Sequence, residues 1–181
     1  MNVWYDAVIK GDLGRVVIGK GSNVQDRALI NGGSLDFANV EDHLITSVGE
    51  YVTIGHAAVV ERAIVGDHAL VGNGAIVGEG SVLEPYSMLA AGAVLGSGQR
   101  VLSKQLWSGN PAKFQRNLSE AEIENLNVNA LEYEKLGELH KNDTGNYLKA
   151  VRLEAMNLLP AEPEAFDTDG GIYQTEISRH N

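Results

Sequence analysis

Pairs of aliphatic residues recur every six positions along the middle of the chain. Six consecutive units open with such a pair: Ile64-Val65, Leu70-Val71, Ile76-Val77, Val82-Leu83, Met88-Leu89 and Val94-Leu95. Most units close on Ala or Ser. An amphipathic helix repeats near 3.6 residues and a half-buried strand repeats at two, so neither explains a period of six. Short strands joined by tight corners do explain it, with three units forming one triangular coil.

The pattern predicts an all-β solenoid over residues 1–117, a parallel β-helix whose stacked coils bury aliphatic ladders. Small residues fit where the interior narrows. Glycines fit the corners, where the backbone takes unusual angles: Gly66, Gly72, Gly74, Gly78 and Gly80. These glycines are not typical of a phosphate-binding loop, because no strand followed by a long helix surrounds them. We take the left hand of the helix from known hexapeptide-repeat proteins, since the general crossover rule favours the right hand.

Residues 32–51 interrupt the repeat and are predicted to be a loop insertion, which a stack of coils tolerates. After the repeat, Ser119 and Glu122 form a capping-box pattern. Apolar residues then recur at helical spacing: Ile123, Leu126, Ala130, Tyr133 and Leu136. The sequence therefore predicts a C-terminal helical segment over 118–159, with a second helical stretch from about Tyr147.

The chain carries a formal net charge of -10, most of it after residue 117. Residues 160–181 are predicted to be an extended acidic tail. An acidic chain does not suit nucleic-acid binding, which needs a basic face. No apolar run is long enough for a membrane span, so membrane association is expected only through partners. The absence of cysteine excludes disulfides and thiolate metal sites.

Several motifs, in the same order along the chain, resemble the γ-class carbonic anhydrase family. They are Val3-Trp4-Tyr5, Gly11-Asp12, Asn23-Val24-Gln25-Asp26, Val52-Thr53-Ile54-Gly55-His56, Met88-Leu89-Ala90-Ala91-Gly92 and Trp107-Ser108-Gly109-Asn110-Pro111-Ala112-Lys113. Within that family, the chain resembles the γ-carbonic-anhydrase-like subunits of mitochondrial respiratory complex I. This resemblance implies a trimer of homologous subunits that contacts other complex I subunits on the matrix side of the inner membrane. Family members usually complete a coil or more before the motif at Val3, so the resemblance leaves open a leading segment.

Active family members hold zinc with three histidines. The resemblance places those ligand positions at Asn31, His56 and Glu61. Asn is a poor zinc ligand, and a set of Asn, His and Glu should bind zinc more weakly than three imidazoles. We therefore expect no zinc of the chain's own, and no carbonic anhydrase activity from this polypeptide alone.

In the family each zinc lies between two subunits, with the ligands at positions 31 and 61 from one chain and that at 56 from the next. In a mixed trimer, His56 could therefore complete a zinc site whose other two histidines belong to a neighbour. The alternative is that His56 is an imidazole hydrogen-bonded at an interface. His43 and His68 lack partner spacing and are expected to be surface residues.

The resemblance also implies roles for four other polar residues. Lys10, Asp12 and Asp26 correspond to an ion-pair network across the subunit interface, with Lys10 in the place of the family's arginine. Lysine keeps the charge but loses the bidentate geometry of arginine. Gln25 corresponds to a position near the metal-bound water, although a structural hydrogen bond explains it equally well.

Two classes of function remain open. The first is a structural accessory subunit of a γ-carbonic-anhydrase-like heterotrimer attached to complex I (NADH:ubiquinone oxidoreductase), a part of the respiratory electron-transport chain. The second is an enzyme, either a γ-carbonic anhydrase that hydrates carbon dioxide through a shared zinc site or a hexapeptide acyltransferase. The acyltransferase reading needs a histidine in a subunit cleft, and none of the five histidines stands out for that role. A scaffold of another assembly, such as a cytoskeletal motor adaptor, is a third reading.

Overall fold

The computed structural model describes residues 1–12, 14–33 and 45–158, and side chains up to residue 143. The predicted acidic tail and His43 lie outside the described residues. Residues Met1–Gly137 form one compact unit and Glu138–Asn181 a second. Within the described residues, no helix combines the length and the apolar content needed to cross a membrane.

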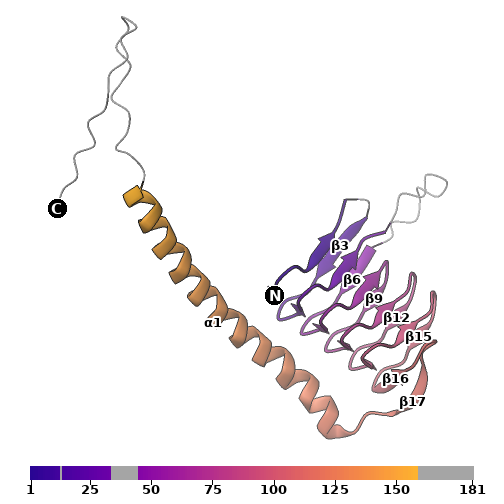
Figure 1. Ribbon diagram of the computed structural model, residues 1–181. Coiled ribbons are helices and arrows are strands. Elements are labelled where there is room, and N and C mark those ends of the chain that lie inside the picture. Colours follow the sequence, from indigo (N-terminus) through magenta and orange to yellow (C-terminus); the bar gives the residue numbers. More distant parts are fainter. Residues whose placement is uncertain (13, 34–44, 159–181) are drawn as a thin grey trace, which may run out of the picture. The chain divides into compact units, whose positions relative to one another are not determined.

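Three parallel sheets wind around one core (Figure 1). Sheet A contains β1 (Asn2–Val3), β4 (Asn23–Val24), β7 (Thr53–Ile54), β10 (Leu70–Val71), β13 (Met88–Leu89) and β16 (Gln105–Ser108), and ends on the antiparallel β17 (Lys113–Asn117). Sheet B contains β2 (Val8–Lys10), β5 (Leu29–Asn31), β8 (Val59–Glu61), β11 (Ile76–Val77) and β14 (Val94–Leu95). Sheet C contains β3 (Arg15–Ile18), β6 (Ile45–Val48), β9 (Ile64–Val65), β12 (Val82–Leu83) and β15 (Arg100–Val101).

Each aliphatic pair divides its two residues between the core and the outer surface. Val65 is 1% exposed and belongs to the core, whereas Ile64 beside it is 50% exposed. The reason is the two-residue alternation of a strand, which sends successive side chains to opposite faces. The predicted interior ladders therefore consist of the second residue of each pair, and the first residue forms an outer row. Burying one such Val or Leu side chain stabilises the fold by about 1.5–3 kcal/mol.

The predicted corner glycines serve two different purposes. Gly74 has a φ of 64°, in the left-handed region that glycine enters without strain. Gly66 does not have a positive φ, but a Cβ there would lie 2.6 Å from the backbone nitrogen of Pro85 in the next coil. Close stacking of coils, as well as corner angles, thus explains the high glycine content.

One part of the predicted loop over 32–51 is a strand. β6 pairs in parallel register with β3, from Arg15 opposite Ile45 to Ile18 opposite Val48. The sequence hid this strand because one inward position is polar: Thr46 is fully buried, and its hydroxyl donates to the carbonyl oxygen of Asn31 at 2.7 Å. The coil therefore resumes at Ile45, before the predicted end of the insertion.

The C-terminal segment is a single helix, α1 (Glu120–Leu158), rather than two stretches. The capping box is confirmed, because the Glu122 amide donates to Ser119 Oγ at 3.3 Å and the Ser119 amide donates to Glu122 Oε2 at 2.9 Å. Hydrogen bonds from Arg116 and Ser119 lower the pKa of Glu122 to about 2. Glycine is a poor helix former, and Gly137 lies inside the helix. This explains why the sequence predicted two helical stretches in place of one.

The first turns of α1 cover the outer face of sheet A. Leu126 and Ala130 are buried there, and the ring of Tyr133 meets the ring of Trp4 edge-on with centroids 5.9 Å apart. Asn2 donates from Nδ2 to the carbonyl oxygen of Tyr133 at 2.9 Å. Leu136 does not join this contact and is 41% exposed. The parallel part of sheet A is thus covered within the chain, whereas β17 is exposed.

His68 lies in a stack of rings at the corner between sheets C and A. Its imidazole lies between Tyr51 and Tyr86, with centroids 5.3 and 4.7 Å away and planes within 12° of parallel. The side chain is half-buried rather than free on the surface. Its role in the described structure is to fill this corner.

Candidate functional site

Two of the three predicted ligand positions lie side by side on the outer face of sheet B. Asn31 on β5 is in register with Glu61 on β8, and Lys10 on β2 is in register with Asn31. The three side chains form one row, which we call the ligand row. Asn31 Oδ1 accepts a hydrogen bond from the Gly33 amide at 3.1 Å, so this oxygen already serves the local turn. Glu61 is exposed.

The third predicted ligand, His56, lies at a corner between sheets A and B, after β7. Its backbone amide donates to Asn73 Oδ1 at 3.0 Å. Its Nδ1 lies 3.4 Å from Asp26 Oδ2, and the two side chains are 44% and 36% exposed. Asp26, predicted to serve the subunit interface, therefore contacts His56 within the chain.

The described residues of one chain do not fit a zinc ion. No group of three or more His, Cys, Asp or Glu side chains that could hold a metal occurs among them. The ligand row offers one carboxylate and one engaged amide, a poor set for zinc, and His56 does not join them in one cluster. A zinc site built on these described residues therefore needs further ligands.

Lys10 and Asp12 form an ion pair within the chain. Lys10 Nζ lies 3.8 Å from Asp12 Oδ2, and the side chains are 45% and 57% exposed. A pair this long and this exposed contributes little to stability. Both groups can therefore exchange partners at a subunit interface at small cost.

A chain of amide and hydroxyl groups, not anticipated from the sequence, connects Gln25 to helix α1. Gln25 Nε2 donates to Asn23 Oδ1 at 3.3 Å, Asn23 Nδ2 donates to Thr53 Oγ1 at 3.0 Å, and Asn129 Nδ2 donates to the same hydroxyl at 3.4 Å. Gln25, Asn23 and Thr53 are all buried. The structural hydrogen bond considered for Gln25 is therefore present.

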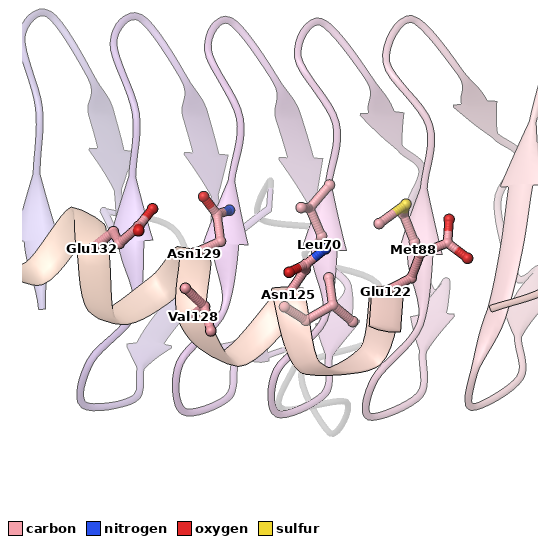
Figure 2. A pocket seen from close by; sticks show the side chains of 8 residues that line it. Leu70, Met88, Glu122, Asn125, Val128, Asn129 and Glu132 are labelled. Atoms are coloured by element: carbon pink, nitrogen blue, oxygen red, sulfur yellow. The ribbon is translucent and has the colours of Figure 1, made fainter. Parts of the chain in front are cut away.

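A groove of about 410 Å³ lies between α1 and sheet A. Figure 2 shows Leu70 and Met88 on the sheet side, and Val128 among the side chains on the helix side. Its polar lining comes from Glu122, Asn125, Asn129 and Glu132. None of the predicted ligand positions lines it, so the groove is separate from the ligand row.

The chain resembles known proteins in both fold and sequence. No protein-family model matches the chain. A solved structure of a hexapeptide transferase family protein from Anaplasma phagocytophilum superposes with a TM-score of 0.68 and 38% identity, covering 75% of each chain. This likeness supports the predicted fold class, a left-handed parallel β-helix of hexapeptide repeats with a C-terminal helix.

Two curated proteins narrow the class. The chain is 39% identical over 137 residues to the "Probable carbonic anhydrase" of Methanocaldococcus jannaschii, covering 76% of this chain and 81% of that one. It is 34% identical over 153 residues to the mitochondrial γ carbonic anhydrase 2 of Arabidopsis thaliana, covering 84% and 54% respectively. The chain therefore belongs to the γ-carbonic anhydrase family, and it spans about half the length of its mitochondrial relative.

Proposed function

We propose that the chain is a structural accessory subunit of a γ-carbonic-anhydrase-like heterotrimer attached to mitochondrial complex I. The observation that carries this proposal is the chemistry of the ligand row, where Asn31 and Glu61 occupy two of the three positions that hold histidines in active family members. The described residues keep the β-helix but offer no zinc site within one chain. A retained fold with lost ligands fits a subunit whose role is assembly.

The outer rows of sheets B and C support an assembly role. Sheet A is covered by α1, whereas Val8 and Ile76 on sheet B are 52% and 39% exposed and Ile64 on sheet C is 50% exposed. Neighbouring subunits in a trimer would cover such rows and remove apolar surface from water. Lys10 and Asp12 lie on the same side of the molecule as the row of sheet B and could supply interface ion pairs.

The mitochondrial location and the attachment to complex I are part of the same proposal. They are supported by the similarity to a mitochondrial γ carbonic anhydrase and by the family motifs in the chain. Attachment would place the chain on the matrix side of the inner membrane, held there by partner subunits.

Affinity purification of the tagged chain from mitochondria tests this proposal. The expected result is co-purification of homologous γ-carbonic-anhydrase subunits, and migration with NADH:ubiquinone oxidoreductase activity on a native gel. Recovery of the chain as a free homomer without that activity would overturn the proposal.

The second candidate function is carbon dioxide hydration through a zinc site shared with a neighbouring subunit. It is favoured by the retention of His56 at an exposed corner beside Asp26. Zinc, when bound, would supply hydroxide near neutral pH for attack on carbon dioxide. Elemental analysis of the native assembly, together with anomalous scattering, tests for a shared zinc site. Zinc beside His56 and two histidines of a neighbour would support a shared site, and the absence of metal near His56 would refute it.

A further inference from the structure

Acidic and amide side chains at the corners of the β-helix have a shared structural task. At three corners, a side-chain oxygen accepts a hydrogen bond from a backbone amide. The amide belongs to the residue that stacks on that side chain's residue in the preceding coil. The pairs are Tyr5 N to Asp26 Oδ1 at 3.1 Å, His56 N to Asn73 Oδ1 at 3.0 Å, and Glu50 N to Asp67 Oδ1 at 2.8 Å. One oxygen of each side chain is therefore sufficient for this task, and Asn performs it as well as Asp.

Asp26 has a second oxygen that this task does not use. Asp26 Oδ2 lies 3.4 Å from His56 Nδ1, because His56 occupies the stacked position in the next coil. The distance is slightly longer than the usual range of about 2.7–3.2 Å for such a hydrogen bond. An ionised carboxylate only accepts hydrogen bonds, so the protonation of Nδ1 decides whether the contact is favourable. A proton on Nδ1 makes the contact favourable, and a lone pair on Nδ1 makes it repulsive.

We propose that Asp26 is a positioning residue that holds neutral His56 in the tautomer with the proton on Nδ1 and the lone pair on Nε2. The group that faces one ring nitrogen sets which nitrogen is free to bind a metal. Nε2 then becomes the donor atom that His56 offers to a zinc-class cation. This inference rests on the shared-site candidate for its use, but the tautomer itself is a property of the metal-free chain.

The backbone around His56 keeps the imidazole at this corner. The Gly74 amide donates to the carbonyl oxygen of His56 at 2.7 Å, and the Ala57 amide donates to the carbonyl oxygen of Asp26 at 2.9 Å. Each residue of the pair is thus held by a backbone hydrogen bond to the coil that follows it. Asp26 has only to select the tautomer and limit the rotation of the ring.

The substitution Asp26→Asn separates the two tasks of this side chain. Its Oδ1 can still accept from the Tyr5 amide, as Asn73 Oδ1 does for His56. Its Nδ2 donates and therefore favours a lone pair on His56 Nδ1, which moves the proton to Nε2. Asp67→Asn is the matched control, since it removes the same charge from an equivalent corner bond.

The test is nitrogen-15 NMR of the histidine rings in the metal-free, full 181-residue chain, at a pH where the imidazole is neutral. His56→Gln assigns the signals. We expect Nε2 to be the unprotonated nitrogen in the wild type and in Asp67→Asn, and Nδ1 to be the unprotonated nitrogen in Asp26→Asn. Protonated Nε2 as the major wild-type form would overturn the proposal, and this result does not depend on the folding of Asp26→Asn.

An unchanged tautomer in folded Asp26→Asn would also overturn the proposal, because Asp26 would then not select it. In a mixed assembly that binds zinc, Asp26→Asn should weaken zinc binding about 10–100-fold, the usual effect of losing such a partner. If the tautomer is as expected but no assembly binds zinc at His56, the positioning role stands and the shared-site function fails.

Discussion

Placing histidines in the ligand row should give a homotrimer of the chain a zinc site. The double substitution Asn31→His and Glu61→His places two imidazoles on β5 and β8 at positions that are in register. Neighbouring strands lie about 4.8 Å apart, so the two rings can converge on one ion with Zn–N distances of about 2.0–2.1 Å. His56 of another copy would supply the third imidazole in a homomeric trimer.

The expected stabilisation of the double variant by zinc follows from the linkage between metal binding and folding. Free zinc at about 100 times its dissociation constant stabilises the folded state by about 2.7 kcal/mol. For a chain of this size that corresponds to a rise in Tm of roughly 5–10 °C, at about 2–4 °C per kcal/mol. Thermal unfolding with and without zinc measures the shift, and elemental analysis after dialysis measures the zinc retained.

Two single variants are the controls. Asn31→His removes the hydrogen bond to the Gly33 amide and so reports the folding cost of the change, about 1 kcal/mol. Glu61→His restores one imidazole without that loss. Each should retain much less zinc than the double variant. If the folded, trimeric double variant retains no more zinc than the wild type, then the identities of Asn31 and Glu61 do not explain weak zinc binding.

Three further predictions concern the fold and its C-terminal segment. Leu89→Ala removes a fully buried side chain from the core and should lower the free energy of unfolding by about 2–5 kcal/mol in urea titrations. A loss below about 1 kcal/mol would contradict that placement.

Because the pKa of Glu122 is lowered from 4.5 to about 2 by Arg116 and Ser119, its carboxylate stabilises the fold above pH 4.5, and this contribution disappears as the pH falls toward 2. Glu122→Gln should remove that part of the pH dependence in circular dichroism, and an unchanged profile would count against it. Deletion of residues 142–181 should impair incorporation into the larger assembly on native gels, and full incorporation would exclude a docking role.

The period of six was sufficient to predict the β-helix, because the hydrophobic pattern and the turn glycines agree along most of the repeat. It could not show which residue of each pair points inward, since both are aliphatic. It also missed β6, where Thr46 takes an inward position through a hydrogen bond to backbone. The break at Gly137 divided α1 in the prediction, whereas the structure has one continuous helix there.

The residues of the candidate site were proposed only through family motifs, and their contacts were not predictable from the sequence. In uninterrupted coils, each residue stacks on the residue one coil further along the chain, as Ile64 does on Val82. The segment before β6 lengthens one coil, so Asn23 and Thr53 are 30 positions apart, and the same spacing brings Asp26 to His56. The six-residue period does not indicate how many residues this lengthened coil contains. For this reason the sequence predicted neither the hydrogen-bond chain from Gln25 to α1 nor the Asp26–His56 contact.

The zinc content of the chain purified alone tests the central claim most directly. The chain would be exposed to excess zinc, dialysed and analysed by elemental quantification, with an active γ-carbonic anhydrase treated in parallel. Because Asn31 and Glu61 make a poor ligand set for zinc, we predict far less than one zinc per chain and no carbon dioxide hydration. One zinc per chain, lost in His56→Ala, would contradict the account and make this subunit a zinc protein in its own right.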